Sequence, residues 1–241
     1  MPSTTFPTAG GLALTGTWLP PAPGRPAFVF LHGYPGQNLN DAVAVAMHRH
    51  GIGSLRFRYR GVVDAPGEYS FAGLRDDVRA AVAHARGLAG GPVGILGYSM
   101  GGNLAVQMVA EDPSLARLLV LLAPVTDLPR LRALWEAVHP GAFAAFIRSG
   151  KGVLRGNAEA RLREAEQVMA RPQAVDLAPS LRMPVLVVAA RRDTEVPADL
   201  VRAFAARLPP GHRFLEVDTG HDLSAAAPQV AEAVAALVGA G

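Results

Sequence analysis

The sequence contains no cysteine, and this absence removes several kinds of chemistry at once. Without a thiol, the chain forms no disulfide, attacks no substrate through a thiolate and binds no metal through sulfur. Charged residues are also scarce, at 18% of 241 residues, whereas half of the residues are hydrophobic. This composition favours a globular chain with a sizeable core, and the length suits one α/β domain.

Basic residues are too scattered to indicate a surface for polyanions. The formal net charge is only +3, and among the 23 basic residues Lys151 is the one lysine. The arginines form no block, and no basic stretch is interleaved with aromatic residues. We therefore expect no nucleic-acid partner.

Long apolar runs are missing as well. The first 24 residues hold neither a basic residue nor the apolar stretch of a signal peptide. No run in the chain approaches the ~18 apolar residues that a membrane helix needs. The expectation is a cytoplasmic protein that works without a membrane. Its oligomeric state is left open, a homodimer included.

The clearest motif is Gly97-Tyr98-Ser99-Met100-Gly101, followed by Gly102. It stands between a short apolar run at 91–96, which predicts a buried strand, and residues 103–111, whose apolar positions recur at helical spacing. A G-x-S-x-G pattern in that setting is typical of a nucleophile elbow, where glycines leave room for a tight turn that exposes the serine. The alternative is a glycine-rich turn with a serine that takes no part in chemistry.

Strand and helix patterns alternate along most of the chain. The apolar runs predict strands over 12–19, 27–31, 54–59, 118–122, 184–190 and 214–217, and helices over 40–50, 74–88, 198–208 and 225–238. This alternation predicts an α/β fold with a mainly parallel central sheet that is flanked by helices. Ser99, the loop 32–36, Asp193 and His221 all follow predicted strands, at the edge where such sheets bind ligands.

Residues 127–180 interrupt the alternation. The segment is too long for a simple crossover and predicts helices over 128–138, 142–148 and 158–170. We predict a small helical cap here, inserted between two parts of a core formed by 1–126 and 181–241. Four bulky uncharged residues of the cap are candidates to line a substrate pocket, although ordinary core packing accounts equally well for any one of them: Trp135, Phe143, Phe146 and Ile147.

Taken together, the motifs resemble the α/β-hydrolase superfamily, and within it the compact serine esterases and carboxylesterases. The likeness extends from Ala27 to the end of the sequence. It rests on the Ser99 elbow and three further segments: His32-Gly33-Tyr34-Pro35-Gly36, Arg192-Asp193-Thr194-Glu195-Val196-Pro197 and Gly220-His221-Asp222. The family's chain order of nucleophile, acid and histidine is kept.

The resemblance implies a role for each residue of a catalytic triad. A serine hydroxyl is a weak nucleophile, so Ser99 needs His221 as its base, and His221 needs the Asp193 carboxylate to fix its tautomer. Asp127, which follows the preceding strand, is the alternative acid. Asp193 is preferred because Asp-x-x-Val-Pro matches the family pattern.

The family also implies an oxyanion hole. Its donors are expected to be the backbone N–H groups of Tyr34 and Met100, while His32 braces the loop that carries Tyr34. Neither a cofactor nor a metal ion is implied.

The expected function is hydrolysis of carboxylic esters with short to medium acyl or aryl groups, about C2 to C8, through an acyl-enzyme. The expected partner is a small-molecule ester. A dehalogenase would carry Asp at position 99 and a dienelactone hydrolase Cys. Three alternatives stay open: a cofactor-free perhydrolase or haloperoxidase-like activity, a thioesterase, and a ligand-binding protein of this fold that lacks catalysis. A carboxylate-bearing substrate is a further option, attracted by Arg130, Arg132, Arg148 and Lys151.

Overall fold

One sheet organises the structure, a computed structural model that describes residues 2–239. The described residues form eight strands in the order β1-β2-β4-β3-β5-β6-β7-β8. The six strands from β4 to β8 in that order run parallel: β4 Gly53–Phe57, β3 Ala27–Leu31, β5 Gly94–Tyr98, β6 Leu119–Leu122, β7 Val185–Ala190 and β8 Arg213–Val217. At one edge, β2 (Ala13–Leu19) and β1 (Ser3–Pro7) pair antiparallel. The predicted α/β fold with a mainly parallel sheet is confirmed.

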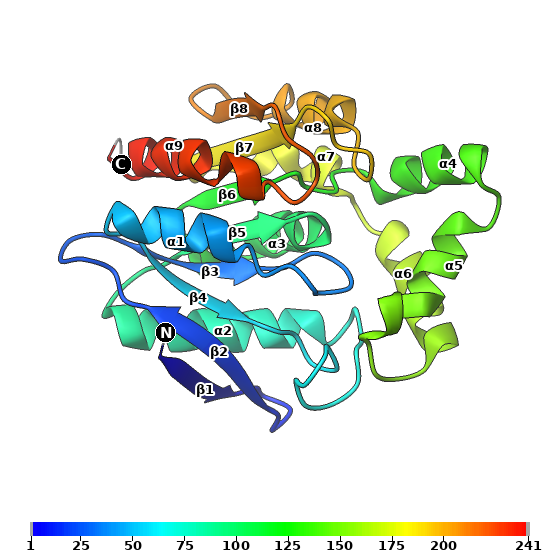
Figure 1. Cartoon of the computed structure of the whole chain (residues 1–241), viewed down its shortest axis with the longest axis horizontal. Coiled ribbons are helices and arrows are strands. Elements are labelled where there is room, and N and C mark those ends of the chain that lie inside the picture. The colour runs from blue at the N-terminus through cyan, green and yellow to red at the C-terminus, as the bar shows by residue number, and fades with distance from the viewer. Residues whose placement is uncertain (1, 240–241) are drawn as a thin grey trace.

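Helices cover both faces of this sheet (Figure 1). One face packs against α1 (Asp41–Arg49) and α9 (Ala227–Gly239), and the other against α2 (Leu74–Ala89), α3 (Met100–Glu111) and α8 (Ala198–Ala205). Neighbouring residues of β3 serve opposite cores, because Cβ atoms alternate across a strand: Phe28 and Phe30 face α1 and α9, and Val29 and Leu31 face the other helices. Burial on both faces explains why the central strands read as continuous apolar runs.

Some boundaries differ from the sequence-based prediction. Strand β5 continues to Tyr98, where it pairs with Leu122, so Ser99 follows the strand directly. The edge strand β1 was not predicted. Of its five residues only Phe6 is buried, and the strand ends at Pro7, so the segment lacks the apolar pattern of a strand. Its backbone pairing with β2 is what makes it one.

The stretch from 128 to 180 is helical, with α4 (Leu128–Val138), α5 (Ala142–Ser149), α6 (Ala158–Met169) and the short α7 (Ala174–Leu177). Helices α4, α5 and α6 lie beyond the carboxyl ends of the strands (Figure 1). Between α5 and α6 the chain is joined to the loop after β4, since Val63 N donates to Val153 O (2.8 Å) and Arg155 N donates to Gly61 O (2.8 Å).

The division into a core of 1–126 and 181–241 and a cap of 127–180 stays a prediction, and its residues 1, 240 and 241 lie outside the described part. Near the end of the segment, Gln173 Oε1 accepts hydrogen bonds from Asn103 Nδ2 (3.1 Å) and Leu128 N (3.2 Å), which ties this end to α3. None of the helices within residues 2–239 is both long and apolar enough to cross a membrane.

Candidate active site

Ser99 occupies a strained turn between β5 and α3. Its backbone angles are φ 53° and ψ −122°, a region that L-residues rarely adopt. The surrounding glycines make the turn possible. A Cβ at Gly97 would lie 2.6 Å from Gly101 O, one at Gly101 would lie 2.1 Å from Leu31 O, and neither fits. The three elements therefore meet too closely for side chains, and the serine is held at the carboxyl edge of the sheet.

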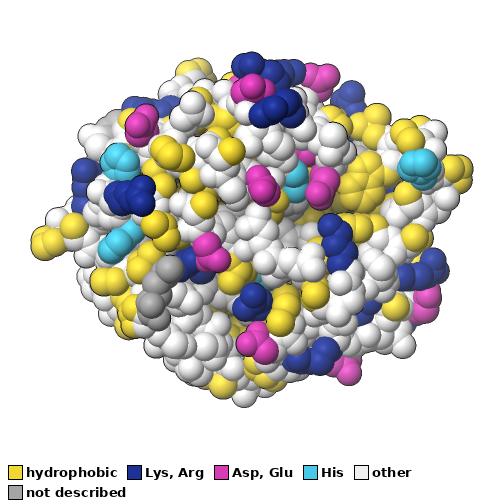
Figure 2. Space-filling view, in the orientation of Figure 1, with side chains coloured by type: hydrophobic (Ala, Val, Ile, Leu, Met, Phe, Trp, Pro, Cys, Tyr) yellow, Lys and Arg dark blue, Asp and Glu magenta, His cyan; other side chains and the backbone are white. Residues whose placement is uncertain are grey.

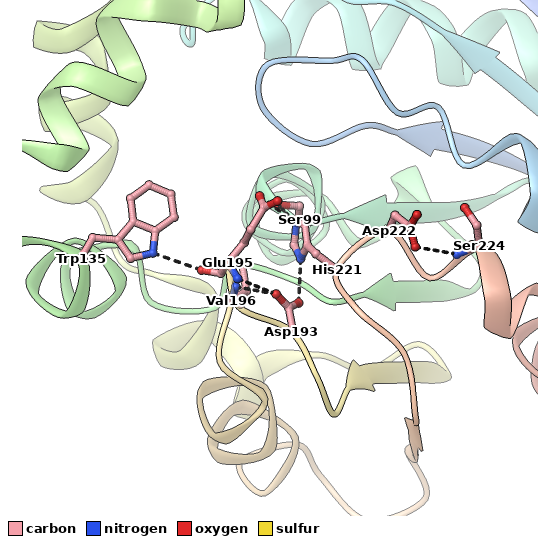
Figure 3. Close-up of polar contacts among 8 residues, drawn as sticks. All are labelled: Ser99, Trp135, Asp193, Glu195, Val196, His221, Asp222 and Ser224. Carbon is pink, nitrogen blue, oxygen red and sulfur yellow. Dashed lines mark hydrogen bonds and ion pairs between the residues drawn. The ribbon is translucent and has the colours of Figure 1, made fainter. Parts of the chain in front are cut away.

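Three of the predicted residues form one hydrogen-bonded series (Figure 3). His221 Nε2 lies 3.0 Å from Ser99 Oγ, and His221 Nδ1 lies 2.7 Å from Asp193 Oδ2. The Asp193 side chain is 1% exposed, and its second oxygen accepts hydrogen bonds from the N–H groups of Glu195 and Val196, both at 2.8 Å. Because an ionised carboxylate only accepts, His221 Nδ1 carries the proton. The Nε2 lone pair then faces the hydroxyl, as a general base requires.

Asp127, the alternative acid, lies at the start of α4 and forms no hydrogen bond with His221 among the residues that the structure describes. Asp127 caps the N-terminus of α4, where its side chain accepts a hydrogen bond from Arg130 N at 2.9 Å. An aspartate in that role stabilises the helix. The geometry thus favours Asp193 over Asp127 as the partner of His221.

The loop after β3 lies directly against the serine. A Cβ at Gly33 would be 2.8 Å from Ser99 Cβ and 3.3 Å from Ser99 Oγ. The next residue, Tyr34, lines the same hollow as Ser99 and Met100. Among the hydrogen bonds of residues 2–239, neither Tyr34 N nor Met100 N has an acceptor. Both of the predicted oxyanion donors therefore remain free to bind a substrate oxygen.

His32 fixes the direction of one of these donors. This imidazole is buried; its Nδ1–H donates to Gly33 O (2.8 Å), and its Nε2 accepts from Tyr59 N (3.2 Å). Burial lowers the pKa of His32 to about 4, so the ring is neutral near pH 7. The Gly33 carbonyl and the Tyr34 N–H belong to the same planar peptide. By holding the carbonyl, His32 also orients the N–H.

A mainly apolar hollow opens beside Ser99. It encloses about 470 Å³ of space, which includes the part that is open to solvent. All four residues predicted to line a substrate pocket are in its wall: Trp135, Phe143, Phe146 and Ile147. Leu128 and Leu131 of α4 also line it, as do Phe71, Val125 and Val196 from outside the helical segment. Phe143 and Ile147 are buried, whereas Trp135 and Phe146 are partly exposed.

Two contacts that no sequence pattern indicated join the helical segment to the site. The Tyr34 hydroxyl donates to Ile147 O at 2.5 Å, and burial raises the pKa of Tyr34 to about 12. Trp135 Nε1 donates to Glu195 O at 3.2 Å, in the loop that also carries Asp193 (Figure 3). The segment therefore contacts both the oxyanion loop and the acid loop.

The predicted cations are not in the wall of this hollow. Arg148 forms an ion pair with Glu159, and Arg132 lies over the ring of Phe143 at 5.5 Å from its centroid. Within residues 2–239, no three His, Asp or Glu side chains are grouped so that they could hold a metal ion.

Sequence comparisons match this chain to known proteins. A model described as the alpha/beta hydrolase family matches residues 28–237. An uncharacterized protein of Mycobacterium tuberculosis is 28% identical over 222 residues, which are 89% of this chain and 70% of that protein.

Two solved esterases share the fold. An esterase of Exiguobacterium antarcticum superposes with a TM-score of 0.72 at 15% identity, over 98% of this chain and 99% of that chain. The Pyrococcus furiosus esterase Pf2001 superposes with a TM-score of 0.73 at 19% identity, over 99% and 90%.

Proposed function

Because this chain belongs to the alpha/beta hydrolase family, we propose that it is a serine hydrolase that cleaves carboxylic esters through an acyl-enzyme intermediate. The observation that carries the proposal is the hydrogen-bonded series from Ser99 through His221 to a buried Asp193, next to an apolar hollow. The esterases that share its fold support the same class of reaction.

In the first half of the reaction, His221 Nε2 takes the proton of the Ser99 hydroxyl while Oγ attacks the ester carbonyl carbon. The imidazolium that forms is stabilised by the Asp193 carboxylate 2.7 Å from Nδ1. The carbonyl oxygen becomes negative and accepts hydrogen bonds from Tyr34 N and Met100 N. Loss of one such donor costs ~3 kcal/mol of transition-state stabilisation.

The tetrahedral intermediate then collapses. His221 gives its proton to the alcohol oxygen, the carbon–oxygen bond of the leaving group breaks, and the acyl group stays on Ser99. A water molecule enters, gives a proton to His221 Nε2 and attacks the acyl carbon. The proton returns to Ser99 Oγ as the acid leaves, so the enzyme is regenerated.

The acyl group is proposed to occupy the apolar hollow. Its wall is uncharged around Phe143 and Ile147, and side chains of helices α4 and α5 line it. Burial contributes ~0.8 kcal/mol per methylene, so selectivity should rise for each carbon that the hollow accepts and then stop. We propose a preference for short to medium acyl or aryl esters, with residues 127–180 acting as the cap over the site.

The test is a series of p-nitrophenyl esters of increasing acyl length, with Ser99→Ala as the blank. We expect kcat/KM to rise up to about C8 and then to level off or fall. A value that climbs steadily beyond about C12 would contradict the small pocket. Equal rates for the wild type and Ser99→Ala would show that Ser99 is not the nucleophile. The matching thioesters and a peroxide-dependent assay distinguish the thioesterase and perhydrolase alternatives.

A further inference from the structure

A second hollow, distinct from the apolar one, adjoins the catalytic residues. It is formed by the loop 33–38 and by Lys151, Glu195, His221 and Asp222. Figure 2 shows this face of the molecule, where an imidazole is flanked by two acidic side chains beside a hydrophobic region. This second hollow is referred to below as the mouth.

The mouth and the apolar hollow meet at Tyr34 and Glu195, since both residues line both spaces. A substrate ester bound to Ser99 extends in two directions from its carbonyl carbon, one for the acyl group and one for the alcohol. The alcohol oxygen must come within hydrogen-bond reach of His221 Nε2 to receive its proton. With the acyl group in the apolar hollow, the alcohol therefore lies in the mouth.

Carboxylates dominate the charge of the mouth. Glu195 Oε2 lies 3.9 Å from His221 Nε2, the atom that protonates the leaving group. The Asp222 side chain lies on the other side of His221 (Figure 3). Lys151 offers one positive charge, and its ammonium group is 5.5 Å from the ring centroid of Phe146. Any group carried by the alcohol close to its oxygen thus enters a space where a carboxylate is the nearest charge.

We infer that Glu195 determines leaving-group specificity, so that the enzyme prefers esters of alcohols that carry a cationic group within a few bonds of the ester oxygen and discriminates against anionic ones. The inference rests on the proposed function, because it assigns the alcohol side of that same site. It places the cationic preference on the alcohol, whereas the apolar hollow continues to select an uncharged acyl group.

The carboxylate of Glu195 can be changed without disturbing the triad. Its backbone N–H donates to Asp193 Oδ1, and its backbone carbonyl accepts from Trp135 Nε1. Both contacts belong to the main chain and survive substitution. The Glu195 side chain is 48% exposed, so Glu195→Gln removes a charge from a solvated position and keeps the shape. Solvent also moderates the expected effect.

The experiment compares two esters that share the butyryl group. Butyrylcholine carries a quaternary ammonium two carbons from the ester oxygen, and 3,3-dimethylbutyl butyrate is its neutral carbon analogue. We expect the ratio of their kcat/KM values to favour the cationic ester and to fall about twofold to fivefold in Glu195→Gln, where fivefold is the upper end for an exposed charge pair. The wild-type ratio should also fall as salt rises.

Asp199→Asn is the matched control. It removes the same charge from an 87% exposed side chain on α8 that lines neither hollow, and it should leave the ratio unchanged. The butyryl ester of glycolate, with an anionic leaving group, should be hydrolysed faster by Glu195→Gln than by the wild type.

The inference is overturned if the ratio is the same in the wild type and Glu195→Gln, or if Asp199→Asn lowers it equally. In that event, Ser99-dependent hydrolysis of the neutral ester would leave the proposed function intact. If the wild type hydrolysed neither of these two esters and none of the p-nitrophenyl series, both proposals would be overturned.

Discussion

Replacement of Asp193 by asparagine tests the direction in which His221 donates and accepts its two hydrogen bonds. In the wild type, Asp193 Oδ1 accepts from two backbone N–H groups, while Oδ2 accepts from His221 Nδ1. An asparagine must keep its oxygen toward the two backbone donors, because an NH₂ group there would leave both of them unpaired. An unpaired donor costs about 1–3 kcal/mol when it is fully buried. The Val196 N–H is partly buried and the Glu195 N–H is exposed, so the cost here is smaller but still favours the oxygen on this side.

The NH₂ group of the new side chain is thereby turned toward His221. It can only donate, so His221 Nδ1 must become the acceptor and Nε2 must carry the proton. In that tautomer Nε2 donates to Ser99 Oγ and no longer takes its proton. We expect kcat to fall by ~10⁴-fold, equivalent to about 5.5 kcal/mol, with the fold preserved.

The assay is kcat for p-nitrophenyl butyrate, together with nitrogen NMR of His221 to identify its tautomer. Asp127→Asn is the matched control, since asparagine is as good an N-cap as aspartate and α4 should be unaffected. The reasoning is refuted if Asp193→Asn retains near-wild-type kcat, or if Asp127→Asn is the more damaging change.

Two further predictions concern the loop after β3. The pKa of His32 is lowered from 6.5 to about 4 by burial, so its contribution to stability is present above pH 6.5 and is lost as the pH falls toward 4, because the unfolded chain binds the proton first. The free energy of unfolding should fall by about 3 kcal/mol, because the pKa is lowered by about 2.5 and one pKa unit corresponds to ~1.36 kcal/mol. Urea unfolding between pH 7 and pH 4 should show this free energy falling more steeply for the wild type than for His32→Asn. Equal slopes for the two proteins would contradict the prediction. Gly33→Ala would place a methyl group 2.8 Å from Ser99 Cβ, so the loop must move away with the Tyr34 N–H. We expect kcat to fall ~10²-fold with a smaller change in KM, and an unchanged kcat would argue against Tyr34 N as an oxyanion donor.

The parts of the site that were predictable are those that follow predicted strands. Ser99 and Asp193 come after the buried strands β5 and β7, and His221 comes after the edge strand β8. The carboxyl ends of these parallel strands lie at one edge of the sheet. The strand pattern before each residue was therefore enough to predict that these side chains lie together, even though Ser99 and His221 are 122 positions apart.

Contacts between the helical segment and the core were not predictable. The Tyr34 hydroxyl bonds a backbone carbonyl 113 positions away, and a main-chain acceptor carries no sequence signature. The placement of Glu195 beside His221 depends on how the acid loop folds back after Asp193. The role of Asp127 did have a signal: an aspartate followed two residues later by proline is typical of a helix start.

The most direct test of the central claim is covalent labelling with a fluorophosphonate, read by mass spectrometry. We expect a single adduct on the peptide that contains Ser99, with activity lost in proportion to labelling. Folded Ser99→Ala should take up no label and should lose ~10⁴-fold or more in kcat. A label on another residue, or a folded Ser99→Ala that still hydrolyses esters, would contradict the assignment of Ser99 as the nucleophile.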